Sequence, residues 1–195
     1  MQNITPYHSK YYATLLTLQN SSSSVNRLSQ SMFNAQIDLN PHQIEAALFA
    51  FQSPLSNGVI LADEVGLGKT IEAGLVLCQY WSEFKRKIII IAPASLRKQW
   101  SMELKEKFFI DSVILEAKSY KDEMKRGNSN PFEQKDALVI TSYQFAVRHE
   151  EEILMAGYNL AVVDEAHKLR NVYKKENKIA KSVKRALANT KKILL

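Results

Sequence analysis

The stretch Ala62-Asp-Glu-Val-Gly-Leu-Gly-Lys-Thr70 decides the fold of this chain. An apolar run at residues 59–62 precedes it, and a helical pattern at residues 70–84 follows it. A glycine-bearing loop between a strand and a helix is the setting that a phosphate-binding loop requires. Gly66 and Gly68 permit backbone conformations in which successive N–H groups point at a phosphate, and the following helix adds the positive end of its dipole. The stretch therefore predicts a nucleotide-binding domain of the α/β class.

The loop also supplies side chains suited to a nucleoside triphosphate and its metal ion. Lys69 would neutralise the β- and γ-phosphates, and the Thr70 hydroxyl would bind Mg²⁺. Asp63 stands where the pattern G-x-x-x-x-G-K-[ST] has its first glycine, and a G-x-G-K-T string alone can be a mere helix N-terminus. The preceding strand and an acidic motif downstream favour phosphate binding, with ATP and Mg²⁺ as the expected cofactors. The expected nucleotide-binding residues of the loop are Asp63, Glu64, Val65, Gly66, Leu67, Gly68, Lys69 and Thr70.

A second motif, Leu160-Ala-Val-Val-Asp-Glu-Ala-His167, places two carboxylates after an apolar strand. Ligands of parallel α/β sheets bind at that edge, beside the phosphate loop. Asp164 would hold Mg²⁺ and Glu165 would orient or deprotonate the attacking water. The alternative is that these acids only cap the next helix. His167 would either relay the nucleotide state to a partner domain or be a hydrogen-bonded histidine at a helix start.

Apolar runs alternate with helical patterns from Leu39 onward. The runs are continuous rather than alternating in polarity, as expected of parallel strands that are buried on both faces. The predicted strands are residues 59–62, 87–92, 112–115, 137–141 and 160–163, and the predicted helices are residues 70–84, 96–107, 143–155 and 175–188. This order predicts a mostly parallel sheet with helices on both faces. Residues 191–195 look like the opening of a further strand, so we expect the domain to continue beyond Leu195.

We expect this domain to occupy residues 37–195, with a separate accessory arm at residues 1–36. The arm is rich in Ser, Asn, Gln and Tyr and includes a run of serines at residues 21–24. It has no apolar core of its own. A short helical or partly disordered lead-in is therefore expected.

The composition, with 46% hydrophobic and 24% charged residues, is ordinary for a soluble globular protein. No apolar run approaches the roughly 18 residues of a membrane span, and no signal peptide is evident, so no membrane partner is expected. Cys78 is the single cysteine and reads as core packing. It fits a reducing compartment, and we expect a cytoplasmic protein, associated with the nucleoid if bacterial. His8, His42 and His149 lack metal-ligand spacing, so no metal site of side chains alone is expected.

Positive charge is concentrated near the end of the chain. Residues 168–192 hold ten Lys or Arg and one acid, Glu176, while the whole chain has a net charge of +6. Such a segment is either the footprint of a polyanion partner or a solvated helix face. At helical spacing, Lys174, Lys178, Lys181 and Arg185 share one face, opposite Ile179, Val183 and Leu187.

Together these motifs resemble the first RecA-like domain of superfamily-two helicases, specifically the Swi/Snf-type ATPases and their bacterial relatives. The segment from Asp63 to Thr70 is similar to that family's phosphate loop, including the acid at its start. Asp164-Glu-Ala-His-Lys-Leu-Arg-Asn171 resembles its DEAH segment. Leu39-Asn-Pro-His-Gln43 is similar to its upstream glutamine motif, in which Gln43 would recognise adenine; Asn40 and His42 replace the more usual Arg and Tyr.

Two further segments match the family more loosely. Ile91-Ala-Pro-Ala-Ser-Leu-Arg-Lys-Gln-Trp100 and Ile140-Thr-Ser-Tyr143 resemble turns that touch the nucleic-acid backbone. The resemblance implies nucleic-acid contacts from Ser95, Lys98, Thr141 and Ser142. From their chemistry alone, Ser95 is as readily a helix N-cap and Trp100 a core aromatic.

The resemblance covers residues 39–195 and implies one half of a motor. It implies a DNA-dependent ATPase that translocates on duplex DNA, with ATP hydrolysed in a cleft against a second RecA-like domain. That domain carries the family's arginine finger and would lie C-terminal to this chain. An RNA or DNA helicase, or a restriction-system motor subunit, is the alternative enzyme. A non-hydrolysing ATP-binding switch or scaffold is the alternative of another class, although it would have no need of Glu165.

Overall fold

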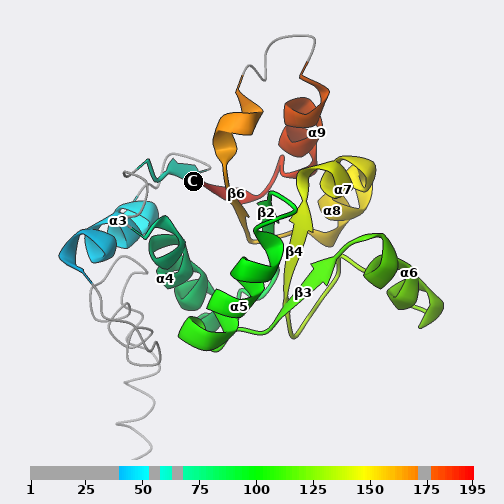
Figure 1. The fold of residues 1–195 in the computed structure, drawn as a ribbon, viewed down its shortest axis with the longest axis horizontal. Helices are drawn as coiled ribbons and strands as arrows, with labels where there is room; N and C mark the ends of the chain where they lie inside the picture. Colours follow the sequence, from blue (N-terminus) through cyan, green and yellow to red (C-terminus); the bar gives the residue numbers. More distant parts are fainter. Residues whose placement is uncertain (1–39, 53–57, 63–67, 171–176) are drawn as a thin grey trace, which may run out of the picture.

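The computed structural model describes residues 40–52, 58–62, 68–170 and 177–195. Its centre is a parallel sheet in the strand order β1-β6-β5-β2-β4-β3 (Figure 1). In the described residues the strands are β1 (Gly58–Ile60), β2 (Ile88–Ala92), β3 (Ser112–Leu115), β4 (Leu138–Ser142), β5 (Leu160–Val163) and β6 (Lys191–Leu194). Every pairing is parallel, which confirms the predicted α/β fold with a parallel sheet.

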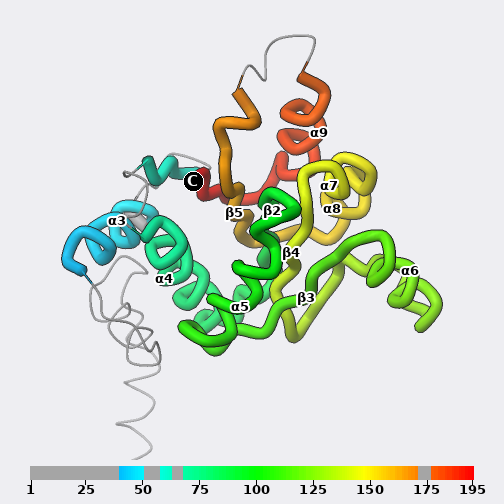
Figure 2. The backbone as a smooth tube through the Cα atoms, in the orientation of Figure 1, coloured from blue at the N-terminus to red at the C-terminus, as the bar shows by residue number. Residues whose placement is uncertain are grey.

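Helices cover both faces of this sheet. Figure 1 shows α3, α4 and α5 on one side and α7, α8 and α9 on the other. The tube view in Figure 2 shows β2 and β4 between these two layers. The bounds are α3 (Pro41–Gln52), α4 (Lys69–Ser82), α5 (Arg97–Phe108), α6 (Ala117–Lys125), α7 (Tyr143–Arg148), α8 (Glu150–Ala156), α9 (Lys178–Ala186) and a short 3₁₀ helix, η1 (Ala166–Leu169).

The central strand β2 explains why its sequence is apolar without alternation. Ile88, Ile90 and Ala92 belong to the core beneath α3, α4 and α5, whereas Ile89 and Ile91 belong to the core beneath α7, α8 and α9. Each of these five residues is at most 1% exposed. Because side chains alternate between faces, a strand that is covered on both faces needs apolar residues at every position.

The predicted elements agree with the structure apart from three helices. Residues 143–155 form two helices, α7 and α8, that meet at His149, whose backbone leaves the helical region (φ −120°, ψ 35°). Helix α6 was not expected, because its sequence AKSYKDEMK shows no apolar stripe, and none of its residues is buried in the structure. A capping box between Glu116 and Ser119 begins this helix. Helix α3 was also not expected, and its start contains the glutamine motif. The predicted arm, residues 1–36, lies outside the described residues.

Helices α4 and α5 approach each other closely at Gly74. A Cβ atom on Gly74 would lie 2.1 Å from Cζ of Phe108, which is 3% exposed. The glycine therefore provides the space into which the Phe108 ring packs. Cys78, one turn later on α4, is buried in the same core, as predicted. None of the helices within the described ranges has the length and apolarity needed to cross a membrane.

Candidate nucleotide-binding site

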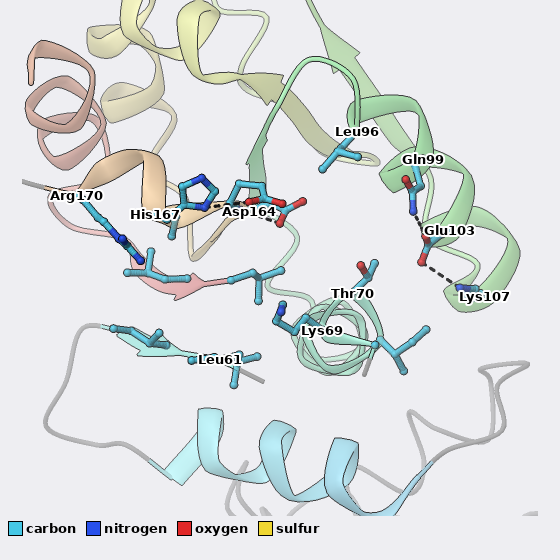
Figure 3. Close-up of a pocket in the computed structure, with 18 residues that line it drawn as sticks. Leu61, Lys69, Thr70, Leu96, Gln99, Glu103, Lys107, Asp164, His167 and Arg170 are labelled. Carbon is cyan, nitrogen blue, oxygen red and sulfur yellow. Dashed lines mark hydrogen bonds and ion pairs between the residues drawn. The ribbon is translucent and has the colours of Figure 1, made fainter. Parts of the chain in front are cut away.

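A pocket of about 960 Å³ opens at the carboxyl edge of the sheet, where β1, β5 and β6 end. It unites the two motifs that the sequence analysis singled out. Figure 3 shows Lys69 and Thr70 at the start of α4, Asp164 just after β5 and His167 on η1, around one space. Glu165 lines the same pocket. Lys69 and Thr70, the end of the predicted phosphate loop, therefore line one pocket with the acidic pair.

The described end of the phosphate loop has the backbone that a glycine provides. Gly68 has φ 89° and ψ 37°, in the left-handed region that residues with a side chain rarely adopt. A Cβ atom there would also lie 2.6 Å from Nε2 of Gln43. Gln43, 5% exposed on α3, thus lies against the loop, and its Oε1 accepts a hydrogen bond from the Asn40 N–H (3.2 Å). The loop residues Asp63, Glu64, Val65, Gly66 and Leu67 lie outside the described residues.

Asp164 is held from several directions. Its Oδ2 accepts a hydrogen bond from Nε1 of Trp100 (2.8 Å), and its Oδ1 accepts one from the backbone N–H of Glu165 (2.8 Å). The hydroxyl of Tyr143 donates a hydrogen bond to the backbone oxygen of Asp164 (2.5 Å). Burial, reinforced by the carboxylates of Asp164 and Glu165, raises the pKa of Tyr143 well above its usual range. The acid expected to hold the metal is thus fixed in both side chain and backbone.

Glu165 occupies a strained turn. Its φ of 56° and ψ of 46° are left-handed although it is not a glycine, a feature that concentrates at functional sites. Its Oε2 lies 3.0 Å from Nδ1 of His167. The next residue, Ala166, donates its N–H to the backbone oxygen of Leu195 (2.8 Å), and Leu195 donates to Val163 (2.9 Å). Hydrogen bonds to the end of β6 therefore support the turn that presents Glu165.

Helix α5 forms the opposite wall of the pocket. Its polar residues Gln99, Glu103 and Lys107 are joined in a row, with Nε2 of Gln99 donating to Glu103 (2.9 Å) and Nζ of Lys107 doing the same (3.0 Å) (Figure 3). A small cavity of about 50 Å³ lies between this helix, Thr70 and Asp164. Sequence reasoning did not assign this wall, since Gln99 and Glu103 have the spacing of an ordinary solvated helix face.

The donors in the pocket fit MgATP. Lys69 supplies an ammonium group, and the Thr70 hydroxyl and Asp164 carboxylate are oxygen ligands of the kind that Mg²⁺ prefers. Gly68, which carries no side chain, leaves room beside the start of α4 for the Gln43 amide. In the part of the chain that the structure describes, no group of three or more His, Cys, Asp or Glu could hold a metal by itself.

The residues expected to contact nucleic acid fall into two groups. Ser95 and Lys98 are exposed beside the start of α5. Ser95 does not cap that helix: its N-cap is Leu96, without a side-chain hydrogen bond. Thr141, by contrast, is 0% exposed and its hydroxyl donates to the Leu115 oxygen (3.1 Å). Ser142 is 8% exposed and its hydroxyl accepts from the Phe145 N–H as the N-cap of α7. Neither hydroxyl is placed at a surface here.

Helix α9 is amphipathic, as its spacing indicated. Val183 and Leu187 are 2% and 1% exposed, while Lys178 is exposed. Ile179, expected on the apolar face, is 37% exposed. Arg185 is engaged by Glu150 of α8, with Nε–Oε1 at 2.5 Å and Nη2–Oε2 at 2.9 Å. Its charge therefore serves the contact between two helices, and Lys174 lies outside the described residues.

The fold and the pocket together define a helicase-like ATPase domain, and comparison with known proteins gives its family. Residues 7–195 match the family model described as the SNF2-related domain. The chain belongs to this family, which confirms the resemblance to Swi/Snf-type ATPases.

Relatives and solved structures agree. The chain is 45% identical over 134 residues to the uncharacterized ATP-dependent helicase YqhH of Bacillus subtilis (strain 168), an alignment covering 67% of this chain and 22% of that protein. It is 40% identical over 133 residues to the RNA polymerase-associated protein RapA of Serratia proteamaculans (strain 568), covering 66% of this chain and 13% of RapA. The Sulfolobus solfataricus SWI2/SNF2 ATPase core in complex with dsDNA matches with a TM-score of 0.66 and 26% identity, over 83% of this chain and 32% of that one. The chain thus spans a minor part of each.

Proposed function

We propose that this chain is the ATP-binding half of a DNA-dependent ATPase that translocates on duplex DNA. The observation that carries the proposal is that one pocket is lined by Lys69 and Thr70 together with Asp164 and Glu165. A domain that only bound ATP as a switch or scaffold would need the first three residues but no positioned general base. The cost of holding Glu165 in a left-handed backbone favours a catalytic role for it.

Each residue of the pocket has a chemical role in this proposal. Lys69 binds the β- and γ-phosphates, and Gln43, held against Gly68, recognises adenine. Thr70 and Asp164 hold Mg²⁺, which supplies positive charge to the phosphates. Glu165 orients the attacking water and accepts its proton. His167, 3.0 Å from Glu165, relays the state of the site to a partner domain.

The choice of duplex DNA has its own support. The similar ATPase core from Sulfolobus solfataricus was solved in complex with dsDNA. In this chain, Ser95 and Lys98 are exposed on the segment that resembles a backbone-contacting turn. Contacts of this kind position a strand without reading its bases. An RNA or DNA helicase, or a restriction-system motor subunit, remains the alternative enzyme. We place the protein in the cytoplasm, at the nucleoid if it is bacterial.

The proposed partner of the pocket is a second RecA-like domain of the same protein. An arginine finger contributed from such a partner raises turnover of NTPases by about 10³- to 10⁵-fold. We therefore expect residues 1–195 alone to bind nucleotide but to hydrolyse it barely above background, without stimulation by DNA. Strong DNA-stimulated hydrolysis by this chain alone would indicate a self-sufficient NTPase instead.

The test measures ATP hydrolysis by the complete protein that contains this domain, with duplex DNA, single-stranded DNA or RNA. Duplex DNA is expected to stimulate most, and Lys69→Ala is expected to abolish both hydrolysis and nucleotide binding. Equal nucleotide affinity of wild type and Lys69→Ala would refute the site. Stimulation by RNA or single strands alone would favour the alternative helicase, and binding without any hydrolysis would favour the switch.

A further inference from the structure

Trp100 connects two parts of the domain that are far apart in sequence. Its Nε1 donates to Oδ2 of Asp164 at 2.8 Å, between α5 and the end of β5. Trp100 is 2% exposed, so its ring is held in place by the core around it. An indole N–H can only donate, and an ionised carboxylate can only accept, which gives the pair a single direction.

This hydrogen bond restricts how the Asp164 carboxylate can turn. One oxygen is bonded to Trp100 and the other to the backbone N–H of Glu165, both at 2.8 Å. A carboxylate has about four acceptor positions, so the carboxylate retains acceptor positions for a metal ion or its water ligands. Without the indole N–H, the side chain would be held at one oxygen only and would be freer to rotate.

A small cavity shows that the indole borders the proposed metal compartment. Thr70, Trp100 and Asp164 all line the cavity of about 50 Å³ beside α5. One water molecule needs about 10–15 Å³ of such volume, so there is room for more than one. The two residues that we propose to hold Mg²⁺ therefore line the same small cavity as Trp100.

The same helix carries a candidate nucleic-acid contact at its start. Lys98 is exposed two residues before Trp100, and Ser95 is exposed just before the helix begins. A shift of α5 by about 1 Å along the bond would move Nε1 and Oδ2 out of hydrogen-bonding range. The position of α5 and the orientation of Asp164 are therefore connected by one bond.

We propose that Trp100 is a positioning residue that orients Asp164 for Mg²⁺ and makes that orientation depend on the position of α5. This inference rests on the proposed function, in which Asp164 holds the metal. Hydrogen-bond partners of metal ligands typically change metal affinity by about 10- to 100-fold when removed. Trp100→Phe keeps an aromatic ring in the core but removes the donor.

The experiment measures ADP affinity of the chain by calorimetry, with Mg²⁺ and with a chelator. The quantity of interest is the factor by which Mg²⁺ tightens binding. We expect Trp100→Phe to reduce this factor by about 10-fold while ADP affinity without metal is unchanged. The matched control is Trp81→Phe, because the Trp81 ring packs against the Arg86 guanidinium (5.2 Å) on the same layer of helices. It is expected to change neither value.

Asp164→Ala and the double variant separate the two hypotheses. If Asp164→Ala leaves the Mg²⁺ factor unchanged, the proposed metal role of Asp164 is wrong. If Asp164→Ala removes the factor but Trp100→Phe does not alter it, the inference about Trp100 alone is wrong. An equal loss of affinity with and without Mg²⁺ would indicate a packing role and also overturn it. In the Asp164→Ala background, Trp100→Phe is expected to have no further effect.

A spectroscopic measurement covers the case in which Trp100→Phe does not fold. The chain has two tryptophans, Trp81 and Trp100. In the Trp81→Phe variant, indole fluorescence therefore comes from Trp100. Adding Mg²⁺ to the ADP complex of this variant is expected to shift the Trp100 emission. An emission spectrum that is identical with ADP and with MgADP would show that the metal does not act on the indole's partner.

Discussion

Nδ1 of His167 lies 3.0 Å from Oε2 of Glu165, and the two side chains are 55% and 44% exposed at the rim of the pocket. The proposed general base therefore has a partner that is open to the surface. A domain docking over this rim would meet both side chains, because both are partly exposed. The pair offers a route by which contact with a second domain alters the position of Glu165.

Glu165→Gln is expected to separate binding from hydrolysis in the complete protein. An amide cannot accept a proton, so kcat should fall at least about 100-fold, the lower end of the usual contribution of a general base. ATP affinity should stay within about 3-fold, because the phosphate-binding residues are untouched. His167→Ala keeps the carboxylate and should cost less. Steady-state kinetics and equilibrium nucleotide binding measure these two effects. A Glu165→Gln variant that retains a tenth of the activity would exclude Glu165 as the general base.

Lysines of α9 should contribute to DNA affinity in a way that Arg185 does not. Lys178 is exposed, whereas the Arg185 guanidinium is bonded to both oxygens of Glu150. Lys178→Ala should lower duplex DNA affinity regardless of sequence and reduce the slope of log K against log salt by about 1. Arg185→Ala is the matched control and should leave the slope unchanged. DNA titrations from about 50 to 200 mM salt measure the slopes of both variants. Equal slopes for Lys178→Ala and wild type would indicate that this face of α9 is only solvated.

Tyr143 should make the fold sensitive to alkali. Burial raises its pKa above the 10.0 of an unfolded chain, so between the two values the unfolded chain releases a proton that the folded one keeps. The stability that the neutral phenol contributes is complete below about pH 10 and is lost as pH rises above it. Tyr143→Phe should make the decline of unfolding free energy shallower by up to about 1.4 kcal/mol per pH unit. Urea unfolding at several alkaline pH values tests this, and unchanged slopes would contradict it.

Gly74→Ala should destabilise the domain even though it improves helix propensity. The propensity gain is about 0.5–1 kcal/mol, whereas overpacking costs about 1–3 kcal/mol, and the added methyl group meets the buried Phe108 ring. In a Phe108→Leu background the clash is relieved, so the same Gly74→Ala change should become neutral or stabilising. Chemical unfolding of the four proteins in this cycle measures the coupling. Destabilisation by Gly74→Ala of the same size in both backgrounds would place the clash elsewhere.

The sequence predicted what depends on local pattern. The strands were recognisable because residues such as Ile88–Ala92 are buried on both faces and must be apolar throughout. The pocket was predictable because Lys69 and Asp164 each follow a strand, and parallel strands end at one edge. The polar helix α6 gave no such pattern, since nothing on it is buried.

What depends on packing between distant residues was not predictable. The motif containing Trp100 indicated either a core aromatic or a nucleic-acid segment, and the ring in fact bonds to Asp164 from within the core. Thr141 lies in a segment that resembles a turn contacting the nucleic-acid backbone, yet its hydroxyl donates to a backbone oxygen of the neighbouring β3. The left-handed backbone of Glu165 has no marker in its residue type. The Trp100 and Thr141 bonds depend on which elements lie next to one another, and that arrangement is a property of the whole fold.

The pairing of β1 with β6 has a consequence for how the site comes into being. In the described sheet, the strand that leads into the phosphate loop is bonded at Gly58 to Lys192 and at Ile60 to Leu194. A ribosome synthesises about 5–20 residues per second, so β1 is made several seconds before β6. Contacts so distant along the chain form late, since the loop between them must close first. During synthesis, therefore, β1 waits several seconds for β6, its partner in the described sheet. We expect the nucleotide site to form only after β6 has joined the sheet.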